Sequence, residues 1–317
     1  MNKLKVNIKK AVKNFLLLIP FVKTKIHHYN RANILLHNSG FEPGHFYSPI
    51  PNLSEIEKDM DRIFTDKVLL GVDLNKEYQM NLLDEFKSYY SEYPYLSNKK
   101  ELQGYRYKKE GAYYRFSDSV FLYSMIRSFK PKKIIEIGSG HSSAIMLDVN
   151  ELFFKGKIHC TFIDPFPQER LFKILRESDK ITNEIIEDKV QSVNPDIFQA
   201  LEKNDILFID STHVSKIGSD VNYLILEVLP KLKPGVLIHF HDIFYPFELP
   251  KEWVLKNRWF WNENYLLHAF LINNKNYEIV AFNSYLQKTE TNWFSKEMPE
   301  CLLGSEDTGS IWIRKLV

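Results

Sequence analysis

Short continuous runs of apolar residues alternate with stretches of helical periodicity from residue 132 to the C-terminus. Runs rich in β-branched and aromatic side chains are typical of strands buried on both faces of a parallel sheet. They predict strands over residues 132–138, 157–164, 183–191, 205–210, 235–242, 276–283 and 309–316. The stretches between them predict helices over residues 142–152, 168–177, 195–201, 219–229 and 261–272. Because right-handed crossovers place such helices on both faces, the pattern predicts an α/β fold with a doubly wound, mostly parallel, Rossmann-like sheet of seven strands.

The first 110 residues lack this alternation, and we expect a mainly helical N-terminal extension that acts as a lid or as a membrane-surface segment. Ser54 is the expected cap of its first helix, because a serine hydroxyl can accept a hydrogen bond from a free N–H of the first turn. The predicted boundary divides the chain into this extension, 1–110, and a main domain, 111–317. Periodicity predicts helices over residues 53–64 and 80–93 in the extension and over residues 117–129 at the start of the main domain.

Composition and charge narrow the class of protein. Hydrophobic residues make up 44% of the chain and charged residues 26%, as in ordinary globular proteins. A net charge of +2 gives no electrostatic case for a nucleic-acid partner. The two cysteines, Cys160 and Cys301, are too few for a disulfide framework, so we expect a reducing, cytoplasmic compartment.

The basic N-terminal segment contains a short apolar run from Phe15 to Val22, which Pro20 interrupts. The run is too short to cross a bilayer, and it lacks the small-residue cleavage site of a signal peptide. Two interpretations stay open. Residues 5–25 form either a basic amphipathic helix on the inner face of the membrane, or a helix packed on the main domain or a partner.

A glycine-rich turn follows the first predicted strand in EIGSGHSS, residues 136–143. Gly138 and Gly140 allow the backbone to come close to a ligand. Ser142 or Ser143 can cap the next helix, whose free N–H groups favour a polar or anionic ligand group. A dinucleotide fingerprint needs a third glycine where this chain has Ser143, so that fingerprint is incomplete.

Carboxylates stand at or beside the ends of several predicted strands, where ligands of such sheets bind. The second strand ends at Asp164, whose two oxygens suit the two hydroxyls of a ribose; the alternative is a helix cap before Pro165. Gln191, after the third strand, could contact an adenine edge, and an ordinary structural role is nearly as well supported. The fourth and fifth strands end at Asp210 and Asp242.

Histidines accompany the last two of these acids. FIDSTH places His213 just beyond the fourth strand, and HFHD places His239 and His241 on one side of the fifth. His241 is nearer the strand end, so it is the better candidate to reach a ligand. An imidazole can remove a proton from a hydroxyl nucleophile, while two histidines and two aspartates could also hold a divalent metal. For each histidine alone, a structural role is the alternative.

These motifs, with FEPGHFYSPIPN upstream, resemble the class I S-adenosylmethionine-dependent methyltransferases over roughly residues 40–283, in particular a bacterial subgroup with many uncharacterised members. The resemblance implies that Glu136 supports the glycine-rich turn and meets the methionine amine of the cofactor. Asp210 lies where catechol-type enzymes place a metal-binding Asp, but His241-Asp242 replaces their Asp-Asn pair. That departure favours a histidine base over a metal, and Asp210 and Asp242 are the candidate ligands if a divalent ion binds. The cofactor-binding residues implied are Glu136, Gly138, Ser139, Gly140, His141, Asp164, Gln191 and Asp210.

The function implied is methyl transfer from S-adenosylmethionine, with a hydroxyl of a small molecule or saccharide as the expected acceptor. His241 is the expected general base and His213 the second candidate, with Asp210 as an orienting or metal-binding partner. Residues 113–118, YYRFSD, could close over the cofactor. Two alternatives remain at this point. One is an NAD-dependent oxidoreductase on a related sheet, and the other is a non-catalytic protein that binds S-adenosylmethionine.

Overall fold

The first of two compact units in the chain covers residues 1–65, and the second covers 66–317. The computed structural model describes residues 24–25, 29, 40–96 and 104–317. In the first unit, helix α3 (Leu53–Lys58) is followed by α4 (Met60–Ile63). Asn52 caps α3 by accepting a hydrogen bond from the backbone N–H of Ser54. The serine expected as the cap therefore lies inside the helix, because the asparagine two residues earlier already satisfies its N–H.

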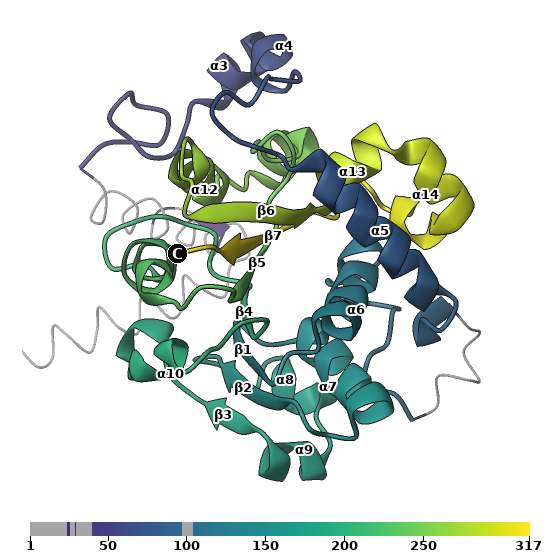
Figure 1. Ribbon diagram of the computed structural model, residues 1–317. Helices are drawn as coiled ribbons and strands as arrows, with labels where there is room; N and C mark the ends of the chain where they lie inside the picture. Colours follow the sequence, from purple (N-terminus) through teal and green to yellow (C-terminus); the bar gives the residue numbers. More distant parts are fainter. Residues whose placement is uncertain (1–23, 26–28, 30–39, 97–103) are drawn as a thin grey trace, which may run out of the picture. The chain divides into compact units, whose positions relative to one another are not determined.

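The second unit is built on one seven-stranded sheet in the order β3-β2-β1-β4-β5-β7-β6 (Figure 1). The pairs from β3 to β5 are parallel, whereas β7 runs antiparallel to both β5 and β6. This confirms the doubly wound, mostly parallel sheet that the sequence predicts. The strands are β1 (Lys133–Ile137), β2 (His159–Ile163), β3 (Glu184–Ile186), β4 (Ile206–Ile209), β5 (Leu237–His241), β6 (Tyr277–Phe282) and β7 (Ser310–Lys315).

Helices cover both faces of the sheet, with α6 and α7 on one side and α10 and α12 on the other (Figure 1). Helix α5, which lies within the predicted extension, packs against α6 and β6 of the second unit. The longer helices are α5 (Lys76–Tyr90), α6 (Ser117–Phe129), α7 (His141–Phe154), α9 (Glu177–Thr182), α12 (Glu263–Leu271), α13 (Asn283–Thr289) and α14 (Thr291–Glu297). The short ones are α8 (Leu171–Ile174), α10 (Asp196–Gln199), α11 (Asp220–Tyr223), η1 (Pro94–Leu96), η2 (Val190–Ser192), η3 (Leu224–Val228), η4 (Leu229–Lys231), η5 (Trp253–Asn257) and η6 (Pro299–Leu302).

One predicted helix is wrong. The stretch 168–177 contains only the single turn α8, after which Leu175 and Arg176 are extended and α9 begins. The break has a local cause, because the carboxylate of Asp179 accepts a hydrogen bond from the N–H of Arg176 at 2.8 Å and so starts a new helix. Helices α13 and α14 were not expected from the pattern.

The order of strands reverses between β1 and β4, since β2 and β3 extend from β1 in one direction while β4 and β5 extend in the other. Loops that leave the carboxyl ends of two such strands part in opposite directions, and the crevice between them is the usual ligand position in open α/β sheets. The turn from β1 into α7 and the loop after β4 both start here. The topology therefore gathers the glycine-rich turn and the strand-end acids at one edge.

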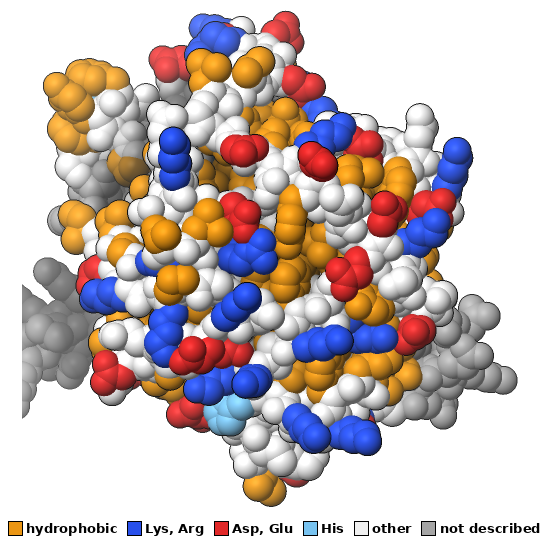
Figure 2. Space-filling model, in the orientation of Figure 1, with side chains coloured by type: hydrophobic (Ala, Val, Ile, Leu, Met, Phe, Trp, Pro, Cys, Tyr) orange, Lys and Arg blue, Asp and Glu red, His pale blue; other side chains and the backbone are white. Residues whose placement is uncertain are grey.

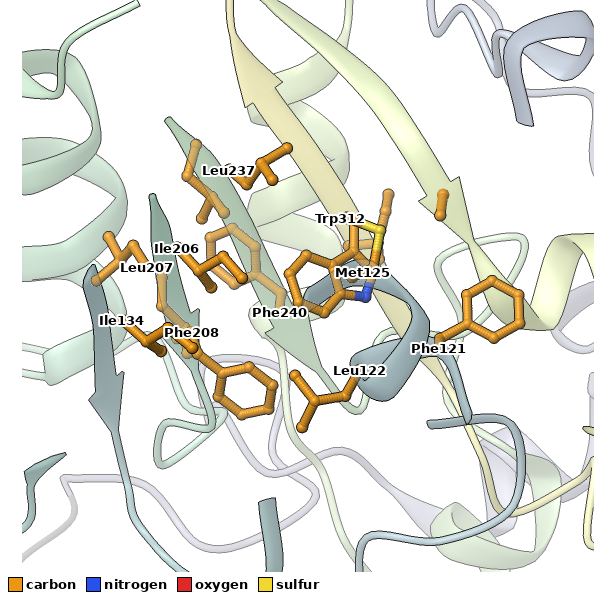
Figure 3. Packing of buried hydrophobic residues seen from close by; sticks show 14 of the residues in the cluster. Phe121, Leu122, Met125, Ile134, Ile206, Leu207, Phe208, Leu237, Phe240 and Trp312 are labelled. Atoms are coloured by element: carbon orange, nitrogen blue, oxygen red, sulfur yellow. The ribbon is translucent and has the colours of Figure 1, made fainter. Parts of the chain in front are cut away.

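The core of the second unit lies between α6 and the sheet. Figure 3 shows Leu122 and Met125 of α6 beside Phe208 of β4 and Trp312 of β7, all of which are fully buried. Burying a side chain of this size contributes about 1.5–3 kcal/mol. His239 of β5 belongs to this core, because its ring lies 4.0 Å from that of Phe208 and 4.5 Å from that of Trp312.

Arg106 fastens the segment before α6 to the helices beside the sheet. Its guanidinium donates two hydrogen bonds to Asp179, of 2.7 and 2.5 Å, and one each to Asp148 and Glu151, of 3.1 and 2.8 Å. The Arg106 side chain is buried, and fork-shaped pairing of this kind fixes direction as well as charge. The network therefore holds residues 104–107 against α7 and α9.

Basic and acidic side chains are interspersed on the face of the molecule that Figure 2 shows, with apolar side chains between them. None of the helices in the described ranges combines the length and the apolar character needed to cross a bilayer. The N-terminal segment 5–25, apart from Thr24 and Lys25, lies outside the described residues.

Candidate functional site

The glycine-rich turn brings the ends of β1 and β4 into close contact. Gly138 has φ +77°, and a Cβ at this position would lie 1.9 Å from the carbonyl oxygen of Asp210. The N–H of Asp210 in turn donates to the carbonyl of Ile137 at 2.9 Å. Only glycine fits here, because any side chain would meet both an unfavourable φ and a backbone atom. Sequence reasoning placed Gly138 near a ligand, and the structure adds this close approach to the end of β4.

Glu136 lies beneath this turn. It is fully buried, and the hydroxyls of Ser142 and Ser143 donate to its two carboxylate oxygens. Burial raises the pKa of Glu136 to about 8, although the two hydroxyls act in the opposite direction. Helix α7 begins at His141, so the two serines lie in its first turn instead of capping it from outside. Glu136 thus supports the turn, while its contact with a cofactor amine stays a prediction.

Asp164 follows β2, beside the glycine-rich turn. One of its oxygens accepts the N–H of Ser139 at 3.0 Å, and the other accepts that of Phe166 at 2.7 Å. Each carboxylate oxygen has a second lone pair, and Asp164 is half-buried, so both oxygens can accept ligand hydroxyls as well. These backbone bonds fix the orientation of the carboxylate. The contact of Asp164 with a pair of ribose hydroxyls stays a prediction.

Two further predicted cofactor residues lie at the start of α7 and in η2. His141, half-buried at the start of α7, has its Nδ1 3.5 Å from the N–H of Tyr113, and burial lowers the pKa of its ring, with a smaller contribution from Arg170. Gln191 lies in η2, beyond β3, and its amide donates to the carbonyl of Gly218 at 2.9 Å. That bond ties Gln191 to the loop after β4.

His213 joins three carboxylates beyond the ends of β4 and β5. Its Nε2 lies 3.3 Å from Asp210 and 3.5 Å from Asp242, and its Nδ1 lies 2.9 Å from Glu263 of α12. Burial alone would lower the pKa of His213, but the hydrogen bonds to Asp210 and Glu263 and the charge of Asp242 raise it well above the usual value. The three carboxylates therefore favour the protonated form of the ring. Glu263 was missed because it lies far along the chain, within the predicted helix 261–272.

The contacts of His213 concern two predicted roles, that of His213 as a general base and that of Asp210 and Asp242 as metal ligands. A protonated imidazole has no lone pair with which to accept a proton, and the pKa of His213 is raised further than that of His241, so His241 is the better candidate for the base. The Nε2 of His213 also lies within 3.5 Å of both Asp210 and Asp242. The described residues contain no group of three or more metal-binding side chains arranged to hold an ion. The metal-binding role of Asp210 and Asp242 stays a prediction.

His241 lies at the end of β5 among acidic groups. Its Nε2 is 3.5 Å from Asp242, and α6 contributes the buried Asp118 nearby. Burial would lower the pKa of His241, but the charges of Asp242, Asp210 and Asp118 raise it. Burial in turn raises the pKa of Asp118 to about 6, and its carboxylate accepts a 2.7 Å hydrogen bond from Asn283. The sequence marked residues 113–118 as a cover for the cofactor but not Asp118 as a neighbour of the base.

Four buried polar atoms near these strand ends have no hydrogen-bond partner within the part of the chain that the structure describes. They are Oη of Tyr114, Oγ of Ser139, Nδ1 of His241 and Oγ of Ser310, which lies opposite His241 in β7. Buried polar groups are almost always paired, so a cluster of exceptions needs an explanation. A polar ligand at the ends of β1, β4 and β5 supplies one. These atoms, Asp164 and the close glycine turn fit a nucleoside that carries a polar, charged tail.

A column of aromatic rings runs outward from His213. The ring of Trp261 lies 4.6 Å from that of His213, and Trp259 stacks on Trp261 at 4.9 Å with an interplanar angle of 10°. Trp253 packs edge-on against both indoles. Trp259 is 40% exposed, so the outer end of the column is open to solvent. The loop after β5 thus provides an aromatic surface connected to the candidate site.

Part of the chain is similar to known proteins. Residues 135–243 match a family model described as a methyltransferase domain. An uncharacterised protein from Archaeoglobus fulgidus is 39% identical over 171 residues, which cover 52% of this chain and 76% of that protein.

Similar solved structures include two methyltransferases. One is the S-adenosylhomocysteine-bound methyltransferase PaMTH1 from Podospora anserina, with a TM-score of 0.40 and 14% identity over 83% of this chain and 95% of the other. Another is the O-methyltransferase TomG from Streptomyces achromogenes in complex with S-adenosylmethionine. Its TM-score is 0.41 and its identity 11%, over 83% of this chain and 96% of the other.

Proposed function

The chain belongs to the class I S-adenosylmethionine-dependent methyltransferases, and from this premise we propose that it methylates a hydroxyl group of a small molecule or a saccharide. The observation that carries the proposal is the position of His241. It lies at the end of β5 beside unpaired buried polar atoms, and an imidazole in its neutral form there can remove a proton from a hydroxyl.

The cofactor would supply a methyl group already activated by a sulfonium, together with a neutral thioether leaving group. Asp164 would hold its ribose hydroxyls, and the backbone of Gly138 and Ser139 would lie against its methionine part. Asp210, half-buried at the end of β4, would face the positive charge. Because the chain needs to form no covalent bond itself, its main contribution is positioning, which in well-aligned reactions reaches about 7–11 kcal/mol.

His241 would take the proton of the acceptor hydroxyl as the new oxygen–carbon bond forms. The imidazolium of His213 would hold Asp210 and Asp242 in place and keep their carboxylates from repelling each other. No step requires a metal. Because His241 must be neutral to accept the proton, kcat/KM should rise with pH through a pKa above the ordinary 6.5 of histidine.

The aromatic column offers a surface for the acceptor. Indole faces bind the apolar faces of sugars and other rings while the polar groups of the ligand stay solvated. Trp259 supplies the exposed end, and Trp261 connects it to His213. An acceptor with at least one ring would thus contact Trp259 while its hydroxyl reaches His241.

A panel of acceptors tests the proposal with radiolabelled S-adenosylmethionine as methyl donor. The panel contains phenols, glycosides and nucleotide sugars, together with primary amines and thiols as other nucleophile classes. We expect label transfer to a hydroxyl-bearing member and its loss in His241→Ala. Transfer only to amines or thiols, or a His241→Ala variant with wild-type turnover, would overturn the proposal.

A matched pair of tryptophan variants tests the acceptor surface. Trp259→Ala should raise the KM for the acceptor and leave the Kd of S-adenosylhomocysteine unchanged. Trp293→Ala, in α14, should change neither. An unchanged acceptor KM in Trp259→Ala would exclude the aromatic column as the acceptor surface.

A further inference from the structure

Tyr114 packs against one face of the sheet at the candidate site. Its ring lies 5.7 Å from that of Phe208, 6.1 Å from that of His239 and 4.9 Å from that of His241. The hydroxyl of Tyr107 donates to the carbonyl of Tyr114 at 2.8 Å and fixes its backbone. The side chain is 3% exposed. Tyr114 therefore holds one position over the ends of β4 and β5.

The hydroxyl of Tyr114 has no hydrogen-bond partner within the described ranges of the chain. Of the buried tyrosines there, Tyr93, Tyr95, Tyr107 and Tyr277 all use their hydroxyls. A phenylalanine would fill the same space without leaving a buried polar atom unpaired. The hydroxyl is thus a cost to the ligand-free fold, and a bound ligand that hydrogen bonds to it would offset that cost.

The surroundings of this hydroxyl define the kind of ligand group that it suits. Strand register aligns Glu136 with Phe208 and Phe208 with His239, so Tyr114 lies over the row that contains Glu136. Burial raises the pKa of Tyr114 well above its usual value, and the charges of Asp118, Asp210 and Glu136 raise it further. The phenol stays neutral, and its oxygen keeps lone pairs for a hydrogen-bond donor. A hydrogen-bond donor placed near the charged carboxylate of Asp210 is favoured when it carries positive charge.

The proposed cofactor carries two positive groups, a sulfonium and an α-ammonium, and only the ammonium has N–H donors. Glu136 is fully buried and its two oxygens already accept hydrogen bonds from Ser142 and Ser143, so a second acceptor beside it would help to hold the ammonium. We propose that the hydroxyl oxygen of Tyr114 accepts a hydrogen bond from the α-ammonium of S-adenosylmethionine and so positions the amino-acid end of the cofactor. This assignment rests on the proposed function.

The test compares the wild-type chain with Tyr114→Phe by calorimetry, using three ligands. S-adenosylhomocysteine contains the whole amino-acid end, its decarboxylated analogue keeps only the amine, and 5′-methylthioadenosine lacks both groups. We expect Tyr114→Phe to raise the Kd of the first two ligands about ten-fold or more, as for loss of a hydrogen bond to a charged group, and to leave the Kd of the third unchanged. Its Tm should equal or exceed that of the wild type, because an unpaired buried hydroxyl is removed.

Tyr277→Phe is the matched control. Tyr277 begins β6, at the edge of the sheet opposite the carboxyl ends of the parallel strands, and its hydroxyl donates to the carbonyl of Leu229 at 2.8 Å. This variant should therefore lose stability and bind all three ligands normally. Unchanged binding of S-adenosylhomocysteine by Tyr114→Phe would overturn the assignment. Equal weakening of all three ligands, or a lower Tm, would mean that the hydroxyl is structural. If the wild-type chain binds none of them, the proposed function itself fails.

Discussion

Gly138→Ala is expected to damage both the fold and the cofactor site. The alanine would keep φ near +77°, which costs about 1–2 kcal/mol for a residue with a Cβ. Its Cβ would also lie 1.9 Å from the carbonyl oxygen of Asp210, so the turn and the end of β4 must separate. Forced repacking of this kind costs about 1–3 kcal/mol more. The total, about 2–5 kcal/mol, is a large part of the stability of an ordinary domain.

Gly156→Ala is the matched control for this perturbation. Gly156 has φ +72°, close to that of Gly138, but a Cβ there would meet no atom within 4 Å. Gly156→Ala should therefore lose only about 1–2 kcal/mol of folding free energy, which is what a positive φ costs a residue with a Cβ. Urea denaturation gives both free energies of unfolding, and calorimetry gives the Kd of S-adenosylhomocysteine. We expect weakened binding in Gly138→Ala only. Equal destabilisation of the two variants, with normal binding in both, would refute the close-approach argument.

Three further results are expected. The pKa of Glu136 is about 8 in the folded chain and has its ordinary value of 4.5 in the unfolded chain, so the contribution of Glu136 to stability falls by up to about 5 kcal/mol as pH rises between these values. In Glu136→Gln, this part of the pH dependence of the free energy of unfolding, measured by urea denaturation, should vanish. The same pH dependence in the variant and the wild type would contradict the raised pKa of Glu136. Arg106→Ala leaves the carboxylates of Asp148 and Asp179 buried without their cation and should cost about 3–5 kcal/mol in the same assay, whereas a loss below about 1 kcal/mol would show the network to be unimportant. Methyl transfer should survive dialysis against EDTA because His213 occupies the position between Asp210 and Asp242, and activity restored only by added Mg²⁺ would disprove this.

The sheet could be predicted from the sequence because its determinants are local. Continuous apolar runs ending in Glu136-Ile137-Gly138 and in Asp210 mark buried strands and the edge where ligands bind. The separation of α8 from α9 could not be predicted, since it depends on the single side chain of Asp179, whose carboxylate pairs with Arg106 and with the N–H of Arg176.

The electrostatics of the site lay beyond sequence reasoning for a different reason. The pKa of His213 is raised because carboxylates from the ends of β4 and β5 and from α12 meet at its ring, and Glu263 is fifty residues away in the chain. Asp118 likewise reaches the neighbourhood of His241 from α6. No spacing in the sequence indicates such meetings, which depend on how the helices pack on the sheet.

The central claim is that the ends of β1, β2 and β4 bind the nucleoside of S-adenosylmethionine. The crystal structure of the chain grown with saturating S-adenosylhomocysteine tests this most directly. The account predicts both ribose hydroxyls within hydrogen-bond distance of Asp164 and the thioether sulfur facing His241. Density for the ligand at any other place, or a ribose that leaves Asp164 uncontacted, would contradict it.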